Sequence, residues 1–155
     1  MERIPEYGVC RLIQSHVTTV LAESEHTLNS GAVVQSQDEG DYETKLASSL
    51  AKHWGIFALV TVTGLNRNGS GMWEVALEVV VHEQINLNRG GNQASQWTAL
   101  RYAEMILATF HETQMTEKPY AYLQADAGAV QLEQEISPII YRVRLLARLG
   151  QVLRF

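Results

Sequence analysis

Two long strand-like segments joined by a turn are the feature that most constrains the fold of this chain. Residues 56–63 are almost wholly apolar and rich in β-branched side chains, which is typical of a strand buried on both faces. Residues 72–84 alternate instead: one side carries Trp73, Val75, Leu77, Val79 and Val81, and the other carries Glu74, Ala76, Glu78, Val80 and His82. The intervening residues 66–71 contain Asn68-Gly69, a strong hairpin signal. The sequence therefore predicts a long antiparallel hairpin.

Apolar spacings of three and four residues predict helices around this hairpin. One helix covers residues 9–23, with an apolar stripe of Val9, Leu12, Ile13, Val17, Val20 and Leu21. A second begins at Asp41 as N-cap and closes at Gly55, after a short strand over residues 32–34. A third covers residues 94–112, capped by Asn92 or Ser95, with an apolar face of Trp97, Leu100, Ala103, Leu107 and Phe110.

The C-terminal third predicts further strands. Residues 129–135 alternate weakly, residues 118–127 give no clear pattern, and residues 139–148 alternate strongly. In that last segment Arg142, Arg144 and Arg148 share one side, which makes a half-buried strand with a cationic outer face. Together these elements predict a single α+β domain over residues 1–155. Its expected form is a two-layer sandwich, with helices packed on one face of a mainly antiparallel sheet.

The charge distribution is uneven along the chain. The net charge is −5, which argues against a general nucleic-acid binder. All 17 acidic residues precede residue 140, whereas Arg142, Arg144, Arg148 and Arg154 follow it. An acidic body with a basic end could pair head to tail with other copies, or the charges could pair across strands within one subunit.

The cysteine content and the distribution of apolar residues indicate the cellular compartment. The single cysteine, Cys10, excludes an intramolecular disulfide and fits a reducing compartment. No apolar run approaches the roughly 20 residues of a membrane helix, and the first residues lack the pattern of a signal peptide. We therefore expect no membrane partner and no export by the chain itself.

Motifs for catalysis, metals and cofactors fail on spacing. There is no Gly-Lys pair for a phosphate loop and no G-x-S-x-G elbow, and the five histidines show no ligand-like spacing. His82-Glu83 is half of a zinc-protease motif on a strand, and the second histidine is missing. The sequence thus predicts no enzyme, with no catalytic, metal-binding or cofactor-binding residues.

The stretch NRGGN, residues 88–92, is the segment that most looks like a binding site, although such a loop more often only connects two elements. Gly90 and Gly91 suit a reversal from strand to helix, and Arg89 could hold an anion or form an interface salt bridge. We favour the interface. Glu74 and Glu78 are expected to pair with Arg142 and Arg144, either across the sheet or across a subunit boundary. The candidate interface residues are therefore Asn88, Arg89, Glu74, Glu78, Arg142, Arg144 and Arg148.

The order of these segments resembles a family of phage proteins. A helix ending in Ala51-Lys52-His53-Trp54-Gly55 leads into an apolar strand and a hairpin, and the second strand ends on Glu83. Asn88-Arg89 follows, then an amphipathic helix, then the strand containing Tyr141-Arg142-Val143-Arg144-Leu145. This pattern resembles the small tail-terminator and tail-completion proteins of tailed bacteriophages and prophages, over about two-thirds of the chain.

The resemblance implies an α+β subunit that closes into a ring, usually a hexamer. Such a ring caps the tail tube, stops its growth and offers a surface to the head connector. The implied partners are copies of itself, the tail tube and head-connector proteins, with no specific nucleic acid. The implied location is the virion tail, and the bacterial cytoplasm during assembly. The alternative is a small non-enzymatic module that binds nucleic acid or protein through the C-terminal arginine strip.

Overall fold

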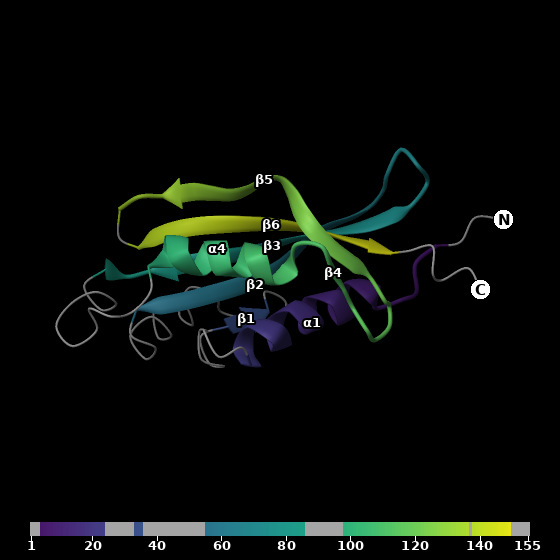
Figure 1. Cartoon of the computed structure of the whole chain (residues 1–155), viewed down its shortest axis with the longest axis horizontal. Helices are drawn as coiled ribbons and strands as arrows, with labels where there is room; N and C mark the ends of the chain where they lie inside the picture. The colour runs from purple at the N-terminus through teal and green to yellow at the C-terminus, as the bar shows by residue number, and fades with distance from the viewer. Residues whose placement is uncertain (1–3, 24–32, 36–54, 86–97, 137, 150–155) are drawn as a thin grey trace.

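Two helices cover one face of a curled, mainly antiparallel sheet, as Figure 1 shows. The computed structural model describes residues 4–23, 33–35, 55–85, 98–136 and 138–149. Within these ranges the sheet has the strand order β1-β2-β3-β6-β5-β4. The elements are α1 (Val9–Glu23), β1 (Val33–Gln35), β2 (Ile56–Arg67), β3 (Trp73–Glu83), α4 (Ala99–Phe110), β4 (Thr113–Gln114), β5 (Tyr122–Gln134) and β6 (Ile139–Leu149). The predicted α+β sandwich, with helices on one face, is confirmed.

The predicted long hairpin is the centre of the sheet. β2 and β3 pair antiparallel from Ile56 opposite Glu83 to Arg67 opposite Trp73. The Asn68 side chain closes the turn, because its Oδ1 accepts from the backbone N–H groups of Ser70 and Met72. β2 is longer than predicted and is buried on both faces only near its start, since most of its second half is exposed.

The last two strands differ in how well the sequence predicted them. β6 matches the predicted segment and pairs with β3 along its whole length. β5 begins at Tyr122, within the stretch that gave no clear pattern. Its register with β6 shifts between Ala125 and Val130, so four residues face Arg144 alone. Because this bulge breaks the alternation, the first half of β5 could not be identified from periodicity.

The core lies between the sheet and the two helices. On β3 it is formed by the predicted inner residues Val75, Leu77, Val79 and Val81, all buried. The predicted helix faces need correction. Leu12 and Leu100 are 45% and 41% exposed, whereas the predicted Ala103 and Phe110 are buried. The buried side of α4 is completed by Ala99, Tyr102 and Ile106, which were not predicted. The α4 cap is also different: Thr98, rather than Asn92 or Ser95, accepts from the Arg101 N–H.

Two buried polar side chains, which the apolar pattern did not predict, tie the helices to the sheet. Gln14 on α1 donates from Nε2 to the carbonyl oxygen of Val60 on β2, at 2.8 Å. Glu83, at the end of β3, is fully buried, and its Oε1 accepts from the Ala99 N–H at 2.9 Å. A carboxylate at this position satisfies one of the unpaired N–H groups that begin a helix and complements the helix dipole.

Several predicted features lie outside the described residues. These are the helix beginning at Asp41, the loop with Asn88 and Arg89, and the basic Arg154. Neither of the two described helices is long and apolar enough to span a bilayer.

Candidate functional site

The face of the sheet opposite α1 and α4 gathers the charged residues of the hairpin and the last strand. The register places Glu78 beside Arg144 and Glu74 beside Arg148, so the two acids of β3 meet the arginines of β6. The charged residues share this face because side chains alternate along both strands, and the apolar side chains of β3 and β6 face the helices.

The charged side chains form ion pairs within one chain: Glu133, Arg142, Glu78 and Arg144 are linked to one another, and Glu74 and Arg148 form a separate pair. Glu78 accepts from Arg142 Nη1, and its Oε1 lies 3.3 Å from Arg144 Nε. Arg142 also donates from Nη2 to Glu133 Oε1 at 2.5 Å, and Arg148 Nε lies 3.2 Å from Glu74 Oε2. We call these six residues (Glu74, Glu78, Glu133, Arg142, Arg144 and Arg148) the charge ladder. It contains three carboxylates and three guanidinium groups, and so it has no net charge.

Arg142 is the centre of the ladder. Burial by itself lowers the pKa of Arg142, but hydrogen bonds to Glu133 and Glu78 outweigh it and raise that pKa above its usual value. Its two partners differ in environment, since the side chain of Glu78 is 15% exposed and that of Glu133 is 44% exposed. Water screens an exposed pair much more than a half-buried one. The Arg142–Glu78 pair, which joins β6 to β3, is therefore stronger than the Arg142–Glu133 pair, which joins β6 to β5.

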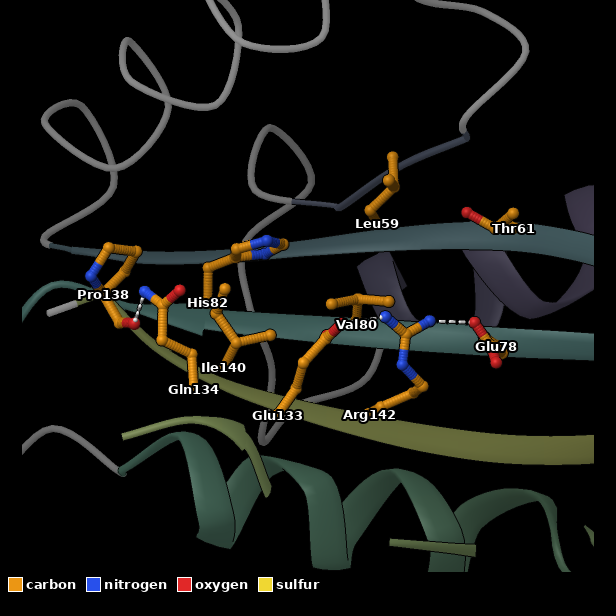
Figure 2. Close-up of a pocket in the computed structure, with 10 residues that line it drawn as sticks. All are labelled: Leu59, Thr61, Glu78, Val80, His82, Glu133, Gln134, Pro138, Ile140 and Arg142. Atoms are coloured by element: carbon orange, nitrogen blue, oxygen red, sulfur yellow. Dashed lines mark hydrogen bonds and ion pairs between the residues drawn. The ribbon is translucent and has the colours of Figure 1, made fainter. Parts of the chain in front are cut away.

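A groove of about 520 Å³ lies beside the ladder residues Glu78, Glu133 and Arg142 (Figure 2). Its apolar part comes from Leu59 on β2, Val80 on β3, Ile140 on β6 and Pro138. The polar lining consists of Thr61, Glu78, His82, Glu133, Gln134 and Arg142. Gln134 is held in place because its Nε2 donates to the carbonyl oxygens of Ile136 and Pro138, at 3.0 and 2.8 Å.

The titratable groups of the groove are already engaged. Glu78 and Glu133 both accept from Arg142, so either would have to leave its guanidinium partner before it could act as a base. His82 is 3% exposed and packs on Phe57, with ring centroids 5.8 Å apart. Burial lowers the pKa of His82, against smaller opposing contributions from the Phe57 and Val80 backbones. His82 is therefore neutral at pH 7.

The buried imidazole predicts a pH dependence of stability. Because the pKa of His82 is lower in the folded state than its ordinary value of 6.5, the unfolded chain binds more protons as the pH falls through 6.5. The free energy of unfolding should thus decrease as pH falls from 7 to 5. His82→Phe keeps a ring against Phe57 and should reduce this slope in urea denaturation series. An unchanged slope would contradict the prediction.

The structure separates His82 from Glu83. His82 lies on the face opposite the helices, beside the groove, whereas Glu83 lies on the helix side and binds the start of α4. The half-motif His82-Glu83 therefore does not form one site. In the part of the chain that the structure describes, no group of three or more His, Cys, Asp or Glu side chains could hold a metal ion.

No protein-family model matches this chain, and no curated protein is significantly similar to it.

The predicted interface residues are partly brought together. Glu74, Glu78, Arg142, Arg144 and Arg148 all join the charge ladder, pairing across the sheet within one subunit. The expected partners were partly wrong, because Glu74 pairs with Arg148 rather than with Arg142 or Arg144. Asn88 and Arg89 lie outside the described residues.

The sequence interpretation missed Glu133, the third acid of the ladder. A hairpin joining the predicted strands 129–135 and 139–148 brings Glu133 close to residue 141, on the other face from Arg142. In the structure β5 and β6 do pair antiparallel, but a register shift between Leu132 and Gln134 changes the position of Glu133, which pairs with Arg142. The sequence pattern does not predict this shift.

Proposed function

We propose that this protein is a structural, non-catalytic subunit of a phage or prophage tail. Copies of it form a ring, with six subunits as the expected number, that terminates the tail tube and joins it to the head connector. Its place is the virion tail, and the bacterial cytoplasm while the particle assembles. The proposal comes from the order of the helix, hairpin and C-terminal strand segments in the sequence.

The neutral charge ladder is the observation that carries the proposal. A neighbouring copy that contacts the ladder meets three acids already paired with three arginines, so like-charge repulsion does not oppose assembly there. The titratable groups of the adjacent groove are engaged or buried, as expected of a surface that packs rather than reacts. Both features favour a building block over an enzyme.

The alternative, a nucleic-acid-binding module, depends on free arginines. Phosphate binding by Arg142, Arg144 or Arg148 would require each to exchange a carboxylate partner for a phosphate. The pairs therefore weaken this alternative. It predicts retention on immobilised DNA at low salt that disappears at high salt, whereas the ring proposal predicts none at low salt.

Electron microscopy of the purified protein tests the proposal. Negatively stained samples should show annular particles of uniform size with a central opening. Subunits that assemble head to tail with closure give such rings, whereas a monomeric binding module gives none. Images without annular particles, together with salt-sensitive retention on DNA, would favour the binding module instead.

A further inference from the structure

Most of the outer edge of β5 has no strand beside it in the described residues. β5 has 13 residues, and β4 pairs only with Tyr122 and Leu123 at its start. In Figure 1 the end of β5 lies on the opposite side of the sheet from β1. Residues 131–134, at this end of β5, are exposed. Leu132 is 47% exposed. This edge therefore offers backbone groups and an apolar side chain to a further strand.

The edge lacks two of the usual protections against pairing, although it carries bulges and the acid Glu133. Natural edge strands commonly carry lysine or proline, and the residues between 124 and 136 contain neither. Register shifts at Ala125/Val130 and Leu132/Gln134 limit the regular part of this edge to Val130, Gln131 and Leu132. The pairing surface is thus a short segment of three residues.

The opposite edge of the described sheet is formed by β1, which has the same length as this segment and runs in the direction needed for antiparallel pairing. β1 has three residues, Val33–Gln35, and none is charged, so it would set no acid opposite Glu133. β1 runs parallel to β2, and β2, β3, β6 and β5 are successively antiparallel. β1 therefore runs opposite to β5. Copies that keep a common orientation would bring β5 of one against β1 of the next in an antiparallel pair, the more stable arrangement.

We propose that Val130–Leu132 of one copy pairs with Val33–Gln35 of the next, so that the sheet continues from subunit to subunit. This inference rests on the proposed ring, because a head-to-tail ring needs two different surfaces on each copy. The two edges of one sheet are such a pair. Leu132 becomes covered by the neighbouring copy, while the charge ladder stays within each subunit.

Leu132→Lys tests the contact. A lysine at this edge opposes strand pairing, so the protein concentration at the midpoint of assembly should rise by about tenfold or more, measured by light scattering after size exclusion. Leu100→Lys is the matched control, since Leu100 is similarly exposed but lies on α4. The control should assemble like the wild type.

The outcomes separate this inference from the proposed function. If the wild type assembles and Leu132→Lys assembles equally well, the edge contact is overturned and the proposed ring is not. The same conclusion follows if Leu100→Lys weakens assembly as much as Leu132→Lys does. A wild type that stays monomeric would overturn both.

Hydrogen exchange of the wild type above and below its assembly concentration gives a readout that needs no variant. Assembly should slow exchange in peptides covering 130–132 and in peptides covering 33–35. Protection at only one of these segments, or at neither, would overturn the pairing of β5 with β1.

Discussion

Glu83→Ala is expected to lower the free energy of unfolding by about 2–4 kcal/mol, as the combined cost of a lost helix cap and an unsatisfied buried N–H. The carboxylate is fully buried and accepts from the Ala99 N–H at 2.9 Å, where α4 begins. Alanine would leave this N–H without its acceptor and open a cavity between β3 and α4. Urea denaturation of the variant measures the loss.

Glu104→Ala is the control for this prediction. Glu104 lies on the same helix but is exposed, so its removal should change the free energy of unfolding by less than about 0.5 kcal/mol. Similar losses in the two variants would contradict the role assigned to Glu83 as the link between the central strand and α4.

The second large effect is expected at the centre of the charge ladder. Glu78→Ala removes the half-buried partner of both Arg142 and Arg144, which leaves two guanidinium groups close together without their shared carboxylate. We expect a loss of about 2 kcal/mol, below that of a fully buried pair because the arginines keep some contact with water. Thermal and urea unfolding measure it.

Glu133→Ala offers a direct comparison, because it removes the other acid bound to the same arginine. The Glu133 side chain is 44% exposed, so its loss should cost less than about 1 kcal/mol. If Glu133→Ala destabilised the protein as much as Glu78→Ala, burial would not be the property that ranks these pairs.

Periodicity predicted the parts of the fold where local pattern and burial agree. Along β3 and β6 every second residue is apolar, and in the structure Val79 and Val143 lie on the helix side while Glu78 and Arg144 lie on the opposite face. The same alternation predicted that acids of one strand would meet arginines of the other. The exact partner depends on register, which a hairpin turn fixes for β2 and β3 but not for β6. This is why Arg148 was not expected as the partner of Glu74.

The remaining features depend on contacts between distant segments. Gln14 and Glu83 are polar, yet both are buried because each finds a backbone partner on another element, Val60 and Ala99. The bulge in β5 hides its first half from any period-two pattern. The groove needs side chains from four strands and Pro138, and no single segment of the sequence predicts it.

The native mass of the purified wild type tests most directly whether copies of this subunit associate through their sheet edges. Because strand pairing and apolar contact join the copies while the ion pairs stay inside each subunit, we expect a mass about six times the 17.3 kDa of the chain, at low and at high salt alike. A mass of 17.3 kDa at every salt concentration would contradict the account.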